Sequence, residues 1–252
     1  MNRRIAIIGL ILCLGLILPF SPTSMATTPT AAFAPWEITG NLYAAAYLDG
    51  DAIPERVEVV ADKGSTSLRI AFSDSRVISV PVGKGESIAM IRLYSADLTG
   101  GGVSELIAFT RDPMRDTYTI TVIENPVGEL TLSSVPDPNE DFYKFKARFA
   151  RGHVLEITNQ AYTFIQSVPV ESEEVLAVYR DDGTAPGTLI ATVSAFMDCT
   201  FAAYSGRPAL ELWQAITANV QAQPLGYIVS TVVWQNGSPK LVGQRYTAKY
   251  PV

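Results

Sequence analysis

The sequence is poor in the two residue types that build many metal centres and nucleophilic active sites. It contains one histidine, His153, and two cysteines, Cys13 and Cys199. Zinc sites built on several of these side chains are excluded by number. A Ser-His-Asp or Cys-His arrangement would have to use His153, and no Gly-x-Ser-x-Gly elbow offers it a serine. Within the stretch ARGHVLEIT, we expect this histidine to lie at a hairpin turn or at the start of a strand.

The chain also lacks an apolar run long enough to span a bilayer. Two arginines precede an apolar run at residues 5–18, and prolines follow it ahead of small residues that end at Ala26. This is the layout of a secretory signal peptide, and the run is shorter than the roughly 20 residues of a transmembrane helix. The sequence predicts a signal peptide over residues 1–26, secreted or cell-envelope localisation, and no membrane attachment after cleavage. An uncleaved anchor and a lipid on Cys13 are the competing interpretations, and the large Leu12 disfavours the second.

Clusters of basic residues are absent as well. Cleavage after Ala26 would remove two arginines and no acid, so the net charge would move from 19 − 25 = −6 to 17 − 25 = −8. Phosphate-binding surfaces need clustered Lys and Arg, so nucleic acid and anionic membrane are disfavoured as partners. Only Cys199 would remain, which excludes an intramolecular disulfide. Its apolar context, SAFMDCTFAAY, predicts a buried, inert thiol.

Short segments rich in Val, Ile, Thr, Tyr and Phe dominate the rest of the chain. RVEVVA at residues 56–61 and SLRIAF at residues 67–72 alternate inward and outward positions. Similar segments follow at residues 76–82, 106–110, 117–124, 130–135, 143–149, 153–158, 162–168 and 226–234. Gly, Pro, Asn or Asp separates most of them. The pattern predicts an all-β fold, as a sandwich, a barrel or a propeller.

Two segments near the C-terminus need separate arguments. Residues 208–223, PALELWQAITANVQAQ, place apolar residues on even positions, so we expect a long strand, with a helix as the alternative. Asn236 and Gly237 tolerate the positive φ of a tight turn and predict a hairpin. Aromatic residues in the final strands, Trp213, Tyr227 and Trp234, are expected in the core. Stacking of exposed aromatic rings on sugars is the alternative.

An internal similarity links two glycine-rich acidic loops. YLDGDAIPERVEVV at residues 47–60 aligns without a gap to DLTGGGVSELIAFT at residues 97–110, at an offset of 50 residues. A looser third copy, SGRPALELWQ at residues 205–214, keeps only a Gly-x-Pro element and the apolar residues after it. Self-similarity at this spacing is typical of repeat architectures, in which a propeller blade takes roughly 40 to 50 residues.

The pattern of these loops resembles the FG-GAP or VCBS repeat of secreted bacterial proteins and integrin-like β-propellers. The resemblance implies a repeat-built, β-propeller-like array of short antiparallel blades. Because the usable length gives only four or five blades at roughly 40 to 50 residues each, an open array or two β subdomains are alternatives. The expected organisation is a flexible lead at residues 27–35, a β region with both loops at 36–136, and a second β region with the third copy and the hairpin at 137–252.

The resemblance also implies a calcium site in each acidic loop. Side chains at alternate loop positions would supply the oxygens, which is the ligand set that calcium prefers. The metal ligands expected are Asp49, Asp51 and Glu55 in the first loop and Asp97, Thr99 and Glu105 in the second. Each loop lacks one acid, because Tyr47 and Gly101 stand at ligand positions. In the competing interpretation, the carboxylates accept hydrogen bonds from loop amides and only shape the turns.

Together these features favour a secreted, non-enzymatic β-repeat module that binds a protein or a cell-surface glycan through its loops. A secreted hydrolase that uses paired carboxylates, such as Asp181 and Asp182, is one alternative, although charged loop residues are mostly solvated. A structural component of the cell envelope is another. No catalytic residue is expected, and calcium is the only cofactor for which the sequence gives an argument.

Overall fold

The computed structural model describes residues 36–37, 43–46, 48–62, 65–84, 91–112, 117–124, 131–134, 140–235 and 238–250. The predicted signal peptide and the lead at residues 27–35 lie outside these residues. The described residues contain no helix with the length and the apolar composition that a membrane span requires.

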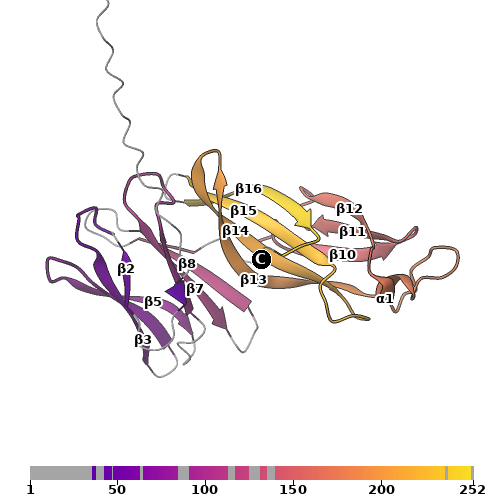
Figure 1. Cartoon of the computed structure of the whole chain (residues 1–252), viewed down its shortest axis with the longest axis horizontal. Helices are drawn as coiled ribbons and strands as arrows, with labels where there is room; N and C mark the ends of the chain where they lie inside the picture. Colours follow the sequence, from indigo (N-terminus) through magenta and orange to yellow (C-terminus); the bar gives the residue numbers. More distant parts are fainter. Residues whose placement is uncertain are drawn as a thin grey trace, which may run out of the picture. The chain divides into compact units, whose positions relative to one another are not determined.

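The described residues confirm the all-β prediction (Figure 1). They form four antiparallel sheets and one short helix, α1 (Glu173–Leu176), and the strands close no barrel. Sheet I has the order β2 (Tyr43–Ala46), β3 (Glu55–Asp62), β4 (Ser65–Ala71), β5 (Val77–Lys84). Sheet II has the order β1 (Trp36–Glu37), β6 (Ile91–Ala96), β7 (Glu105–Asp112), β8 (Thr117–Glu124), β9 (Thr131–Ser134).

The other two sheets come from the second half of the chain. Sheet III has the order β10 (Phe145–Ala150), β11 (Val154–Asn159), β12 (Ile165–Pro169). Sheet IV has the order β13 (Ala191–Tyr204), β14 (Arg207–Ala218), β15 (Gly226–Gln235), β16 (Ser238–Thr247). Each sheet is built from consecutive hairpins, except that β1 is added beside β6.

The structure also tests the two C-terminal predictions, the long strand and the hairpin. Residues 207–218 form the strand β14, so the helix alternative for the segment that begins at residue 208 is wrong. Gln235 pairs with Ser238, which confirms the hairpin around residues 236–237. The strand predictions did not include β6 or β13, although β13 is the longest of the described strands at 14 residues. Its composition, with Ala, Ser, Asp and Cys among the apolar residues, gives a weak β signal.

Sheet II is covered on both faces. Leu93, Leu106 and Ala108 belong to a core cluster with strands β3 to β5 of sheet I. Ile107 and Phe109, which point to the opposite face, belong to a second cluster with β13, β14 and β15 of sheet IV. The near-continuous apolar run LIAF in β7 follows from this double burial, because a strand with two buried faces needs apolar residues at both parities.

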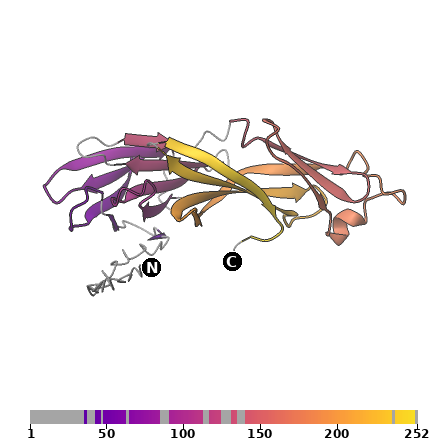
Figure 2. The same ribbon diagram turned by 90° about the horizontal axis from the view of Figure 1, so that it is seen from above.

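A third cluster joins sheets III and IV. It includes Leu155 and Ile157 of β11, Val175 of α1, and Ile216 of β14. Both views show the strands β10 to β12 beside sheet IV (Figures 1 and 2). Of the aromatics expected in the core, Trp213 and Trp234 are 3% and 2% exposed, whereas Tyr227 is only half-buried. Cys199 is also buried, as its apolar context predicts.

Candidate metal centre

The first acidic loop joins β2 to β3 and is fixed by two buried residues. Leu48 is fully buried, and Glu55, the first residue of β3, is 1% exposed. The backbone N–H of Leu48 donates a hydrogen bond of 2.5 Å to Oε2 of Glu55. Gly50 adopts φ +78°, which glycine reaches at little cost. The apolar anchor and the positive φ hold the loop in a tight bend over the end of β3.

The bend brings three carboxylates together. One oxygen from each of Asp49, Asp51 and Glu55 lies within 4.8 Å of the other two. Asp51 is held in place, since its Oδ1 accepts the N–H of Ile53 at 2.6 Å and its Oδ2 accepts the hydroxyl of Ser73 at 2.9 Å. Oδ1 of Asp49 accepts the N–H of Asp51 at 3.1 Å. The structure therefore places the three predicted ligands of the first loop around one point.

One oxygen of this group has no hydrogen-bond partner in the described part of the chain. Oε1 of Glu55 is buried and accepts no hydrogen bond from any described residue. Burial raises the pKa of Glu55, and the negative charge of Asp49 raises this pKa further. A buried, unpaired carboxylate oxygen is costly, and two neighbouring carboxylates repel unless a proton or a cation neutralises them. The site therefore has the geometry and the charge to hold a cation.

The second acidic loop joins β6 to β7 and repeats the anchor of the first. Leu98 is buried, and its N–H donates a hydrogen bond of 2.5 Å to Oε2 of Glu105, the first residue of β7. The other oxygen, Oε1 of Glu105, accepts the hydroxyl of Thr99 at 2.8 Å. Burial raises the pKa of Glu105 as well, as it does for Glu55. Unlike Glu55, Glu105 has a partner for both oxygens.

The carboxylate of Asp97, the remaining acid of the second loop, accepts hydrogen bonds from backbone amides. Oδ1 of Asp97 accepts the N–H groups of Gly100 and Gly101 at 2.6 and 3.0 Å, and Oδ2 accepts the N–H of Gly102 at 2.8 Å. The structure thus brings Asp97, Thr99 and Glu105 together, but the carboxylate oxygens of Asp97 and Glu105 already accept hydrogen bonds from within the loop, one of them donated by Thr99. This is the turn-shaping arrangement that the sequence left open.

The two loops lie next to each other. A Cβ atom added to Gly50 would lie 3.2 Å from Cγ2 of Val103, which belongs to the second loop. Ser73, in the turn between β4 and β5, completes the first loop through its hydrogen bond to Asp51. Neither contact could be predicted from local sequence patterns, because both join residues that are far apart along the chain.

Other residues considered from the sequence lie away from this centre. Ser205 and Gly206 form the turn between β13 and β14, and the third copy forms no acidic loop there. His153 is exposed at the turn between β10 and β11, as expected, with its ring centroid 4.7 Å from that of Tyr179. Asp182 is exposed, and its pKa is lowered mainly by the hydrogen bond that it accepts from the Thr184 hydroxyl.

Comparison of the chain with protein-family models, with curated proteins and with solved structures finds no match. The function must therefore be argued from the geometry.

Proposed function

We propose that this protein is an exported, non-enzymatic β-repeat module that is stabilised by calcium in its first acidic loop and binds a protein or a cell-surface glycan. The observation that carries the metal site is the buried, unpaired Oε1 of Glu55 beside the carboxylates of Asp49 and Asp51. Carboxylate oxygens are the ligands that calcium prefers, and backbone carbonyls and water complete its coordination.

The second loop is proposed to fold without metal. The amides of three glycines and the hydroxyl of Thr99 donate hydrogen bonds to its carboxylates. These donors take the place that a cation would otherwise fill. The chain thus contains its own comparison, because the two loops share the anchor between a leucine amide and a glutamate. They differ in whether the glutamate has an unpaired oxygen.

The placement of the loops supports the repeat and the resemblance to FG-GAP or VCBS proteins. Each loop joins two adjacent antiparallel strands, β2 to β3 or β6 to β7, of a sheet built from consecutive hairpins. Sheets I, II and IV pack face to face in this order through two core clusters. Face-to-face packing of small antiparallel sheets is the principle of a propeller, so we propose an open, propeller-like array.

A binding role is preferred to catalysis because the candidate catalytic groups, His153 and Asp182, are engaged in contacts with neighbouring side chains. The ring of His153 contacts that of Tyr179 at an interplanar angle of 50°, and Asp182 accepts hydrogen bonds from the amide and the hydroxyl of Thr184. Because the pKa of Asp182 is lowered, this group suits a general acid poorly.

A thermal melt in calcium and in chelator tests the proposal. Calcium at about tenfold its Kd should raise the melting temperature by about 2–5 °C, because a ligand that binds only the folded state stabilises it. Glu55→Gln should abolish the rise. This variant keeps an acceptor for the Leu48 amide but removes the charge.

Glu105→Gln is the matched control, because it changes the equivalent residue of the second loop. The calcium-dependent rise should persist in this variant. A midpoint that is the same in calcium and in chelator for the wild-type protein would overturn the metal site, and equal loss in both variants would show that the second loop also binds calcium.

A further inference from the structure

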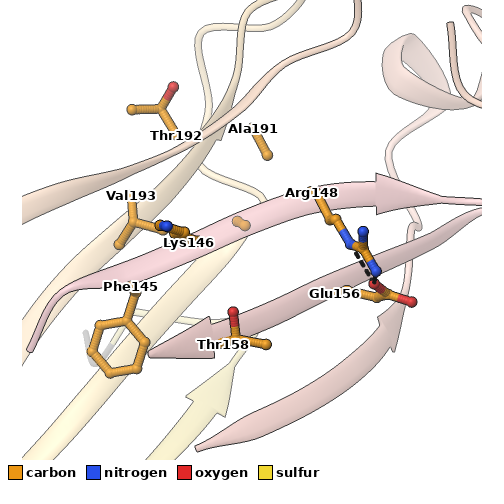
Figure 3. A pocket seen from close by; sticks show the side chains of 9 residues that line it. Phe145, Lys146, Arg148, Glu156, Thr158, Ala191, Thr192 and Val193 are labelled. Carbon is orange, nitrogen blue, oxygen red and sulfur yellow. Dashed lines mark hydrogen bonds and ion pairs between the residues drawn. The ribbon is translucent and has the colours of Figure 1, made fainter. Parts of the chain in front are cut away.

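A groove of about 640 Å³ lies between sheets III and IV (Figure 3). Its walls are residues 145–148 of β10 and residues 191–193 of β13, and Glu156 and Thr158 of β11 complete it. β10 and β13 are the edge strands of their sheets, because each has one neighbour. The groove is therefore bordered by two unpaired strand edges.

The free edge of β10 presents the backbone of its odd-numbered residues. The N–H of Gln160 donates to the carbonyl of Lys144, so the hydrogen-bonded pairs of this hairpin fall at even positions of β10. The N–H and C=O groups of Phe145 and Ala147 consequently point away from β11. They are the groups with which an added strand would pair.

The same argument applies to β13. The N–H of Asn219 donates to the carbonyl of Ile190, so even positions at the start of β13 bond to β14 and the polar groups of Ala191 and Val193 point to the free edge. The two edges are tied together at one end by the Gln214 amide, whose Nε2 donates to the carbonyls of Tyr143 and Ser194 at 3.2 and 2.9 Å. The groove begins beside this link.

The other sheet edges among the described residues carry features that discourage pairing with another chain. β1, β2 and β9 are two to four residues long, and very short edges are poor templates. The longer edges β5, β12 and β16 contain Pro81, Pro169 and Pro239, and proline blocks strand addition. β10 and β13 contain no proline. The two longer edges without proline are therefore the ones that border the groove.

The charge of the rim indicates the kind of segment that fits. Lys146 and Arg148 alternate along β10 with the half-buried Phe145 and Ala147, which face the core. Arg148 pairs with Glu156 at 2.6 Å, as Figure 3 shows, whereas the ion pairs found among the described residues do not include Lys146. A carboxylate opposite Lys146 on a neighbouring strand would be a favourable cross-strand pair.

We propose that the groove binds an extended segment of a partner protein, in which apolar residues alternate with acids, as an added strand on β10. Backbone hydrogen bonds to Phe145 and Ala147 would give affinity, and the alternate side chains would give specificity. The proposal rests on the binding role proposed above and names the partner class, but it is independent of the calcium site. A polypeptide is favoured over a glycan because the free groups follow the spacing of a β-ladder.

The probe for the test is a labelled seven-residue peptide of alternating valine and glutamate, and a matched peptide carries lysine in place of glutamate. Fluorescence anisotropy measures binding, and hydrogen exchange of residues 145–150 locates it. We expect saturable binding of the glutamate peptide, slower exchange in β10, and binding of the lysine peptide that is at least about tenfold weaker.

Ala147→Pro removes an N–H that points into the groove and no ladder bond to β11, so binding of the glutamate peptide should fall by at least about tenfold. Ser167→Pro is the matched control, because the bond from the Val170 amide to the His153 carbonyl places the Ser167 amide at the opposite edge of the same sheet. This variant should bind as the wild-type protein does. Lys146→Glu leaves the backbone unchanged and should reverse the preference between the peptides.

Absence of saturable binding up to about 1 mM, or equal binding by Ala147→Pro and the wild-type protein, overturns the proposal. Slower exchange of β10 on addition of oligosaccharide alone, or a dimer that Ala147→Pro dissolves, assigns the groove to another occupant and also overturns it. All titrations are repeated in chelator and with Glu55→Gln. Peptide binding that survives both treatments separates the groove from the calcium site.

Discussion

At the scale of single residues, Glu55 and Gly50 carry the most information about the first loop. Glu55 starts β3 and turns its carboxylate back to the amide of Leu48, so one oxygen supports the fold, while the other is buried and accepts no hydrogen bond from a described residue. Gly50 supplies the positive φ that the bend requires and brings the first loop against Val103. Substitution of Glu55 tests the contribution of its carboxylate to stability, and substitution of Gly50 tests the contribution of the bend.

The buried carboxylate of Glu55 predicts an unusual pH dependence in the absence of calcium. Its pKa is raised above 4.5, so the folded state binds the proton more tightly than the unfolded state. The free energy of unfolding should therefore fall as the pH rises from about 4.5 through the raised pKa. Urea unfolding in chelator between about pH 4 and 7 measures this fall.

Calcium should remove the contribution of Glu55 to this fall, because it replaces the proton between the carboxylates. Glu105 contributes with the same sign, since its pKa is also raised by burial. Glu55→Gln should make the profile shallower in chelator and insensitive to calcium, whereas Glu105→Gln should keep the calcium effect. A wild-type profile that rises with pH across this range would contradict the assignment.

Replacement of Gly50 by alanine should destabilise the protein for two reasons. The φ of +78° is strained for any residue with a Cβ, at a cost of about 1–2 kcal/mol. The new Cβ would also lie 3.2 Å from Cγ2 of Val103, so the second loop must shift. Chemical denaturation should therefore show a loss above about 1 kcal/mol for Gly50→Ala.

Gly100→Ala is the control for the backbone strain alone. Gly100 has a similar φ of +75°, and a Cβ added there meets no atom within 4 Å. Its loss of stability should be smaller than that of Gly50→Ala. Adding Val103→Ala to Gly50→Ala should recover the part that is due to crowding, and losses that are equal in the two glycine variants would show that the loops do not press on each other.

At the scale of elements, an ion pair joins β6 of sheet II to β13 of sheet IV. Nη2 of Arg92 donates to Oδ1 of Asp198 at 2.5 Å, and the guanidinium lies 4.3 Å from the centroid of the Phe109 ring. Asp198 also accepts the N–H of Cys199 at 2.7 Å. Because the carboxylate side chain is 14% exposed, loss of its partner leaves a poorly solvated charge.

Arg92→Met should therefore lower the free energy of unfolding by about 1–3 kcal/mol. A double-mutant cycle with Asp198→Asn should give a coupling energy above about 0.5 kcal/mol. The pair of Arg76 and Asp74 is the control, because it has the same 2.5 Å separation but both side chains are more exposed. Its coupling should be smaller than that of Arg92 and Asp198 because solvent screens an exposed pair, and equal couplings would refute a special role for the buried pair.

The hydrogen bonds of Asn159 connect sheet III to sheet IV. The buried amide of Asn159 donates to the carbonyl of Phe142 and to the side chains of Thr163 and Gln244, the last of which lies on β16. Oδ1 of Asn159 accepts two further backbone amides, those of Thr163 and Phe164. These hydrogen bonds of Asn159 fix the position of β11 beside sheet IV. Because β10 pairs with β11, they also help to position the wall of the groove that β10 forms.

At the scale of the whole molecule, three core clusters connect the four sheets in series. Sheets I and II share the first cluster, sheets II and IV share the second, and sheets III and IV share the third. Sheet IV therefore belongs to two cores along its long strands. Loosening of β13 would disturb both of them.

Labelling of Cys199 measures how readily β13 opens. It is 2% exposed, and burial raises the pKa of its thiol, so the reactive thiolate is rare in the folded state. Labelling of Cys199 by a thiol reagent should require global unfolding, and its rate should rise with urea as the global unfolding equilibrium does. Mass spectrometry of the labelled peptide measures the rate. Labelling that is independent of urea would instead indicate local opening of β13.

Much of the secondary structure could be predicted from the sequence because it depends on local patterns. Alternation in RVEVVA and SLRIAF identified β3 and β4, and the even-numbered apolar residues of the segment 208–223 identified β14. β13 escaped because its mixed composition has no clear period and its ladder contains irregularities near Phe196. A bulge shifts the alternation and removes the signal on which the prediction depends.

The sequence alone determined the strand character, the two acidic loops and the set of carboxylates within the first loop, because residues a few positions apart are constrained by the local backbone. Only the tertiary structure decided which glutamate oxygen has no hydrogen-bond partner among the described residues, that Ser73 supports Asp51, and that β10 and β13 face each other across a groove. These properties depend on contacts between distant segments, which form only when the sheets pack and burial removes water from the groups between them.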